Sequence, residues 1–136
     1  MRIAVPPRYD PNRGQGDRFA PPGKYTARFD RLWLDKSPSG KPVARMQFTV
    51  FAPPQYDGYR ARAYFVLDEN DGNGLARFQN ALVSLGLAGE EVKVGFKSFD
   101  GISGRCDGRV VNIAVEKQRG NSWTTVTHVA PGGPKV

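Results

Sequence analysis

Cysteine and histidine are almost missing from this chain of 136 residues, which has one of each, Cys106 and His128. A single cysteine excludes an intrachain disulfide framework, and one cysteine with one histidine cannot supply the ligands of a structural zinc site. A nucleophile–base pair is not expected either, because the two residues are far apart in sequence and lack an obvious orienting partner. We therefore expect no enzymatic activity, no metal and no cofactor.

Long apolar runs and calcium-binding patterns are missing as well. No stretch approaches the roughly 18 apolar residues of a membrane-spanning helix, and no signal-peptide pattern opens the chain. The acidic stretch LDENDGNG fails the spacing of a calcium loop, since counting from Asp68 puts Asn73 at the sixth position and Gln79 at the twelfth. The sequence predicts a soluble protein away from membranes, and its one cysteine suits a reducing cytoplasm.

Acidic residues are scarce relative to basic ones: 13 aspartates and glutamates stand against 20 lysines and arginines, which gives a formal net charge of +7. Basic residues dominate the stretches 23–67 and 108–136, and acidic residues dominate the stretch between them. If the two basic blocks meet in space, the molecule has one cationic face, which suits a polyanionic partner.

The chain divides into three parts. The first part is basic, rich in proline and without apolar periodicity, which predicts an extended arm pinned to the rest of the protein by Ile3, Val5 or Phe19. Strand and helix patterns follow and indicate a single domain. The parts are the arm (residues 1–22), the domain (residues 23–130) and a short tail (residues 131–136).

Apolar and polar residues alternate with the period of a β-strand in five stretches. In the first stretch, the step from Phe29 to Leu32 breaks that period, as a β-bulge or a sharp bend does. In the third, Arg60, Arg62 and Tyr64 share the side opposite to the apolar residues. The stretches are GKYTARFDRLWLD, VARMQFTVF, YRARAYFVL, GRVVNIAVEK and WTTVTHV, with QRGNS as the expected hairpin turn between the last two.

A helical period replaces the strand period between the third and fourth strands. Between Asn73, a candidate N-cap, and Gly86, a candidate stop, four apolar residues recur at helical spacing: Leu75, Phe78, Leu82 and Leu85. The residues that follow, up to Asp107, are expected to be irregular, with a short strand at EVKVGF (residues 91–96).

The order of three strands, one helix and a two-stranded hairpin predicts an all-β fold with one helix. It is the order of the OB-fold, a five-stranded Greek-key barrel with a helix between strands three and four. No alternation of strands and helices indicates a parallel sheet. A half-open five-stranded sheet with one helix is the structural alternative.

The phase of the first three strands places arginines and aromatic rings on their outer face. Phosphates need positive charge and unpaired bases need flat apolar surfaces, so this combination suits a single-stranded nucleic acid. Readers of duplex DNA instead tend to insert a helix or a ribbon into a groove, and Arg77 is the one basic residue of the expected helix. Alternatively, the rings pack beneath loops or beneath the arm. The candidate nucleic-acid-binding residues are Arg28, Arg31, Trp33, Lys36, Lys41, Arg45, Phe51, Arg60, Arg62, Tyr64, Lys117, Arg119 and Trp123, and Tyr56 adds a ring from a loop.

Several of these stretches also match a known family. The frame PPGKYTARFDRLWLDKSPSGKPVARMQFTVF, followed by YDGYRARAYFVL, ARFQNALVSLGL and GRVVNIAVEKQRGNSWTTVTHV, resembles the small OB-fold single-stranded DNA-binding proteins encoded by tailed bacteriophages. The resemblance covers residues 19–131. It implies sequence-tolerant binding of single-stranded DNA during phage DNA replication or recombination, in the cytoplasm of the host cell. The residues that it assigns to binding are Arg45, Arg60, Arg62 and Tyr64, with Lys117 and Arg119 from the last hairpin.

Single-stranded DNA is therefore the expected partner, although RNA presents the same phosphates and bases and is not separated from it by the sequence. A structural or assembly module that docks through its proline-rich ends is the second interpretation. Replication or recombination proteins are implied as further partners, but no acidic residue follows Glu116, so we expect no recruitment through an acidic tail. The pattern leaves open whether the chain forms a homo-oligomer.

Overall fold

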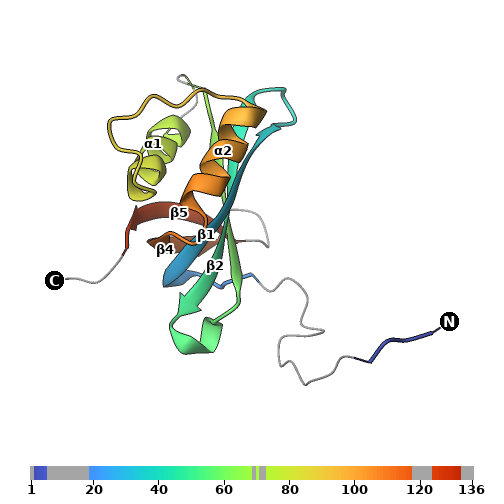
Figure 1. Cartoon of the computed structure of the whole chain (residues 1–136). Coiled ribbons are helices and arrows are strands. Elements are labelled where there is room, and N and C mark those ends of the chain that lie inside the picture. Colours follow the sequence, from blue (N-terminus) through green and yellow to red (C-terminus); the bar gives the residue numbers. More distant parts are fainter. Residues whose placement is uncertain (1, 6–18, 69, 71–72, 118–123, 133–136) are drawn as a thin grey trace.

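The computed structural model describes residues 2–5, 19–68, 70, 73–117 and 124–132. Within these ranges the chain forms a mixed α/β arrangement of five strands, with two α-helices between the third and fourth strands (Figure 1). The elements in chain order are β1 (Gly23–Lys36), β2 (Pro42–Ala52), a short 3-10 helix (Pro54–Tyr56), β3 (Arg60–Val66), α1 (Gly74–Ser84), α2 (Phe96–Cys106), β4 (Val110–Lys117) and β5 (Thr124–Pro131).

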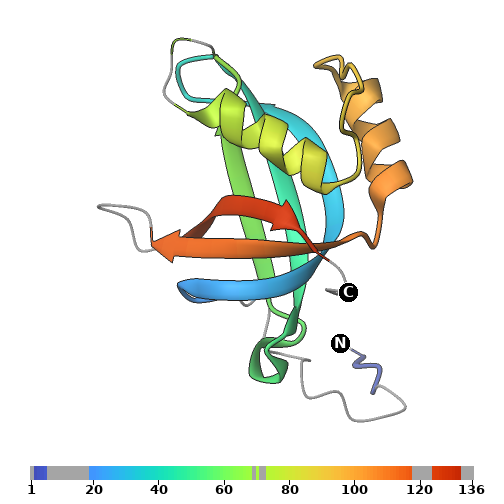
Figure 2. The ribbon, with the colours of Figure 1, turned by 90° about the vertical axis from the view of Figure 1, so that its left-hand side faces the viewer.

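The five strands form a closed ring in the order β1-β2-β3-β5-β4, which β4 completes by pairing with β1. The pairings are antiparallel except that of β3 with β5, which meet in parallel at Ala63 and Val126. Figure 2 shows β4 and β5 running across the direction of β2 and β3, with both helices toward one end of the ring. In the described ranges, neither helix is long and apolar enough to cross a membrane.

An extra residue bends β1, which pairs with two strands, β2 and β4. The first half of this strand pairs with β4, and most of its length pairs with β2. The register with β2 shifts between Phe29 and Arg31, so that Asp30 is the additional residue of a β-bulge, and bulges bend a strand. The predicted break in the period of two is therefore confirmed, and Phe29 and Leu32 both face the core.

Alternate residues of the strands fill the interior of the ring. In β3, Ala61, Ala63 and Phe65 are at most 3% exposed, whereas Arg62 is exposed. Burying a large apolar side chain contributes roughly 1.5–3 kcal/mol, so these inward positions fix the phase of each strand. The predicted phase is confirmed in the other strands by the buried residues Tyr25, Ala27, Phe29, Leu32, Met46, Phe48, Val50, Val111, Ile113 and Val115.

The predicted helix is α1, and a second helix, α2, occupies the stretch that was predicted to be irregular. The α1 helix follows Asn73 and ends before Leu85, close to the predicted bounds, although the Asn73 side chain makes no capping hydrogen bond. In α2, Phe99, Ile102 and Cys106 share one face and are buried. The prediction of an all-β fold with one helix is therefore wrong in its helix count and class.

Packing against β1 explains why α2 forms despite a weak sequence pattern. Gly101 and Gly104 each lower its intrinsic helix stability by about 1 kcal/mol relative to alanine. The Ser103 hydroxyl, however, lies 2.9 Å from both the backbone nitrogen and the carbonyl oxygen of Leu32. These groups lie on the part of β1 that β4 leaves unpaired, so α2 covers an open strand edge.

Residues 91–96 do not form the short strand that was predicted for them. A strand needs hydrogen-bonding partners along its length, and the part of β1 that β4 leaves unpaired is covered by α2. The apolar side chains of Val94 and Phe96 are instead 48% and 71% exposed.

The predicted arm is described in two pieces with different surroundings. Ile3 and Val5 are 77% and 85% exposed, so neither of these two candidates pins the arm. Phe19 does contact the domain, because it forms a parallel bridge with Arg60 of β3. The backbone N–H of Ala20 then donates to the Arg60 carbonyl at 2.9 Å, and Ala20 is buried.

Candidate nucleic-acid interface

Cross-strand pairing brings the predicted residues of β1, β2 and β3 onto one outer surface. Residues that pair directly on neighbouring strands point to the same side of a sheet. Phe51 continues the outer side of β2, and we call the whole surface the arginine face. Its three rows are Trp33, Arg45 and Tyr64; Arg31, Gln47 and Arg62; and Arg28, Thr49 and Arg60.

Three aromatic rings of the arginine face each lie against a guanidinium group. A cation within about 6 Å of a ring centroid is attracted to the ring. All three rings are partly exposed, which leaves both ring and guanidinium surface open to a planar ligand. The distances from the guanidinium carbon to the ring centroid are 4.7 Å for Arg31 on Trp33, 4.9 Å for Arg45 on Tyr64 and 5.6 Å for Arg28 on Phe51.

Tyr56, the loop ring that was added to the candidates, packs inside the protein instead. Its ring lies edge-on to that of Tyr25, at 5.4 Å between centroids, and to that of Tyr59, at 5.3 Å. It rests against the hydrophobic core. The prediction that Tyr56 contributes to the interface is therefore not supported by its position, because its neighbours are packing residues.

Carboxylates engage two of the predicted cations. The Nε of Arg45 lies 2.7 Å from the carboxylate of Asp35, and the Nζ of Lys41 lies 3.2 Å from that of Asp68. The pKa of Asp35 is lowered, first by the hydrogen bond from the backbone N–H of Lys36 and then by Arg45. A phosphate that reaches Arg45 or Lys41 therefore competes with a carboxylate, which the sequence pattern did not reveal.

Lys36 and Lys117 lie at strand ends, outside the three rows. Lys36 is exposed at the end of β1. Lys117 is exposed at the end of β4, which pairs with β1 and β5 and not with β2 or β3, so the structure does not bring it into the three rows. Arg119 and Trp123 lie outside the described residues.

Phe19 joins the arginine face, although the sequence pattern assigned it to the arm. Its ring centroid lies 4.9 Å from the guanidinium carbon of Arg62, and its side chain is 44% exposed. The bridge to Arg60 holds its backbone beside β3. A single aromatic residue outside a strand has no periodicity that assigns its direction, so its sequence signal was weak.

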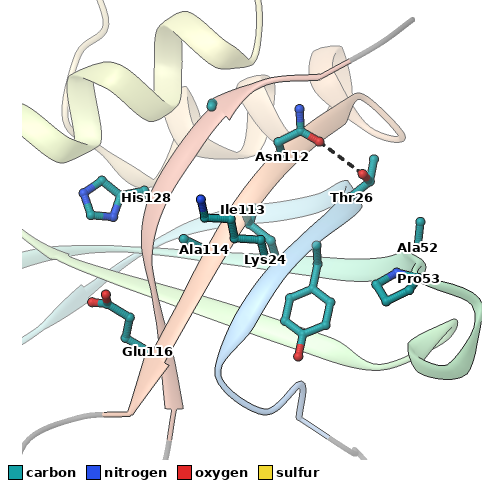
Figure 3. A pocket seen from close by; sticks show the side chains of 11 residues that line it. Lys24, Thr26, Ala52, Pro53, Asn112, Ile113, Ala114, Glu116 and His128 are labelled. Carbon is teal, nitrogen blue, oxygen red and sulfur yellow. Dashed lines mark hydrogen bonds between the residues drawn. The ribbon is translucent and has the colours of Figure 1, made fainter.

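An open hollow of about 880 Å³ lies over β1, β4 and β5, beside the end of β2 (Figure 3). Lys24, Glu116 and His128 line it, and the hydroxyl of Thr26 lies 3.1 Å from the amide oxygen of Asn112. Its lining mixes one cation, one carboxylate and an imidazole. A polyanion is therefore served better by the arginine face than by this hollow.

The single cysteine and the single histidine have separate surroundings. Cys106 is buried at the end of α2, with its Sγ 3.6 Å from the carbonyl oxygen of Leu85, and burial raises the pKa of its thiol. His128 is exposed on β5, with its Nδ1 3.0 Å from the hydroxyl of Thr127. The described contacts of the two residues do not bring thiol and imidazole together.

No model of a known protein family matches the chain, and no curated protein matches it. The arginine face is therefore interpreted from its own geometry and chemistry.

Proposed function

We propose that this chain binds single-stranded DNA without strong sequence preference and without catalysis, through the arginine face. One observation carries the proposal: three cross-strand rows gather five arginines on a single outer surface, among aromatic rings. The resemblance to phage-encoded single-stranded DNA-binding proteins supports a role in phage DNA replication or recombination.

We also propose that the closed ring is an OB-fold. The strand order β1-β2-β3-β5-β4 supports this assignment, as does the placement of the helices between β3 and β4. In that fold, the face of the second and third strands and the loops beside it bind oligonucleotides. The arginine face spans those strands and extends onto β1.

Phosphates and bases would use different parts of the same surface. The guanidinium groups neutralise phosphates, and unpaired bases stack on the rings, at about 1–3 kcal/mol per base. Because a guanidinium is itself planar, a base can stack on an arginine as well as on a ring. Every base has a flat face, so stacking tolerates any sequence. In a duplex these faces are covered by neighbouring base pairs, so stacking on the protein favours single strands.

A salt titration tests the proposal. The affinities of the protein for a labelled single-stranded DNA without self-complementarity, for its duplex and for the matching RNA are measured by fluorescence anisotropy. We expect tight binding of the DNA strand at low salt, with log K falling by about 0.7 per phosphate contact for each tenfold rise in salt. Lack of binding, or equal affinity for the duplex, contradicts the proposal. A clearly higher affinity for the RNA would mean that RNA, and not single-stranded DNA, is the ligand.

The double variant Arg31→Ala with Arg62→Ala locates the binding. Both side chains are exposed in the middle row, so we expect at least tenfold weaker binding and a salt slope smaller by about 1.4 for two lost phosphate contacts, with a loss of stability of no more than about 1–2 kcal/mol from the two lost cation–π contacts. The control Lys93→Ala with Lys97→Ala removes the same charge from exposed positions before and within α2. If the control weakens binding equally, net charge and not the arginine face explains it.

A further inference from the structure

A carboxylate lies within the arginine face. Asp30, the additional residue of the bulge in β1, is partly buried, and its Oδ2 accepts a hydrogen bond from the Thr49 hydroxyl at 2.6 Å. Thr49 is on the outer side of β2, so the Asp30 side chain is on the same outer surface. The carboxylate is thus held in a fixed direction and has acceptor capacity left on its other oxygen.

The cations around Asp30 do not neutralise it directly. Among the described residues, the ion pairs include Asp35, Asp68 and Glu90, and Asp30 is not part of any of them. Thr49 is its hydrogen-bond partner. Yet four arginines occupy the rows on either side: Arg28, Arg31, Arg60 and Arg62.

A fixed carboxylate at this place selects what lies above it. It repels a phosphate, so a strand that crosses the arginine face would place a base edge there and not its backbone. The base must donate a hydrogen bond to the carboxylate. Cytosine, adenine and guanine carry an exocyclic amino group, whereas thymine presents carbonyl oxygens on both sides of one N–H. Those carbonyl oxygens face the carboxylate unfavourably.

We infer that Asp30 makes the interface favour an amino-bearing base over thymine at one position, through the acceptor oxygens of its carboxylate. This inference rests on the proposed function, because it concerns a nucleic acid bound to the arginine face. It assigns Asp30 as a specificity-determining residue within an otherwise sequence-tolerant surface.

The test compares oligo(dC) with oligo(dT) of equal length at pH 7.5, in the wild type and in Asp30→Asn. The amide keeps an oxygen that can accept the Thr49 hydroxyl, but it can both donate and accept, so it no longer discriminates between the two bases. We expect the dC-to-dT affinity ratio to fall by about fivefold or more in the variant, the lower range of discrimination by a base-edge contact. The affinity for oligo(dT) should rise, because a negative charge is lost.

Two further variants separate the carboxylate from its surroundings. Asp35→Asn makes the same charge change on the same face, but Asp35 is already engaged by Arg45, so the ratio should stay at the wild-type value. Thr49→Val removes the hydroxyl that orients the Asp30 carboxylate but keeps the negative charge at the same position of the bulge, so the ratio should fall less than in Asp30→Asn. A ratio that falls as in Asp30→Asn would mean that the hydroxyl sets the preference.

The outcomes distinguish the two proposals. If the wild type binds neither oligonucleotide, the proposed function fails and the inference fails with it. If the wild type binds both and Asp30→Asn strengthens both equally, the carboxylate only repels phosphates, and the inference alone is overturned. If the ratio falls in Asp30→Asn, is kept in Asp35→Asn and falls less in Thr49→Val than in Asp30→Asn, the inference is supported.

Discussion

At the scale of single residues, Arg28, Arg31 and Arg45 each rest on an aromatic ring of their own face. An arginine held in this way loses less conformational freedom on binding a phosphate than one that moves freely in water. The rings therefore support the charges before any ligand arrives. Arg45 is also tied to Asp35, so it is the most constrained of the three.

Glu90 gives a prediction about pH. Its carboxylate accepts two hydrogen bonds of 2.8 Å from Arg105, and the hydrogen bond from Arg105 lowers its pKa below the ordinary value of 4.5. A lowered pKa in the folded state means stability that is present above the unfolded pKa and lost as pH falls through the folded pKa. We expect Glu90→Gln to lower the urea midpoint at pH 7, and the difference from the wild type to shrink below about pH 4.5 and then vanish.

The neighbouring variant Glu91→Gln is the control for that experiment. Glu91 is exposed, and the change removes the same charge from the next position in the chain. A midpoint that falls equally in both variants, or a difference that persists after acidification, contradicts a specific contribution of the Glu90–Arg105 pair.

The direction of individual side chains was predictable only inside regular strands. The period of two assigned Arg60, Arg62 and Tyr64 to the outer face because each strand has one buried side. It could not assign Asp30, because a bulge suspends the period at that residue. It could not find the partner of Arg45 either, because an ion pair depends on side-chain conformations across a hairpin and not on spacing.

At the scale of elements, packing and not sequence pattern alone decides which stretches form helices. The α1 helix begins against the end of β3, where a Cβ on Gly74 would lie 2.5 Å from the carbonyl oxygen of Val66. The α2 helix has an exposed side, where a Cβ on Gly101 would meet no atom within 4 Å. The apolar spacing of α1 was visible in the sequence, whereas α2 depends on β1 for its stability and was missed.

Gly74→Ala should therefore destabilise the protein, although alanine is the better helix former. A contact of 2.5 Å with backbone forces α1 away from β3, and such overpacking costs about 1–3 kcal/mol. Urea denaturation measures the loss. Gly101→Ala is the matched control, and it should stabilise the protein by about 0.5–1 kcal/mol, since it adds a helix former in open space. Equal effects of the two substitutions would contradict this account of α1.

At the scale of the whole molecule, the described basic residues of the second block, Arg109 and Lys117, lie outside the three rows of the arginine face. The block over residues 23–67 supplies the arginine face. In the other block, the guanidinium of Arg109 lies beside Gly86 after α1, and Lys117 is at the end of β4. The charge pattern predicted one cationic face if the two blocks meet in space. These two residues do not join the three rows, because charge counts do not contain the order of strands around a ring.

Residues on the two sides of β2 have different expected roles: the inner side stabilises the fold, and the outer side binds the ligand. Phe48 is fully buried inside β2, whereas Phe51 is partly exposed outside it against Arg28. We expect Phe48→Ala to lower the free energy of unfolding by about 3–5 kcal/mol. Phe51→Ala should lose only about 0.5–1 kcal/mol with its cation–π contact, yet should weaken oligonucleotide binding through a lost stacking surface of about 1–3 kcal/mol.

Denaturation and anisotropy measurements on both phenylalanine variants check this division. Once the unfolded fraction of Phe48→Ala is taken into account, its affinity for the oligonucleotide should equal that of the wild type. A Phe51→Ala protein that binds normally would show that this ring does not contact the ligand.

The bulge in β1 joins two properties in one residue. Without Asp30, Phe29 and Leu32 would still face inward and Arg31 would still face outward, because a regular period of two would be restored. The strand would lose its bend and the surface would lose its carboxylate together. A deletion of Asp30 would therefore remove the curvature and the base preference in a single change, whereas substitutions at this position can change the second and leave the first.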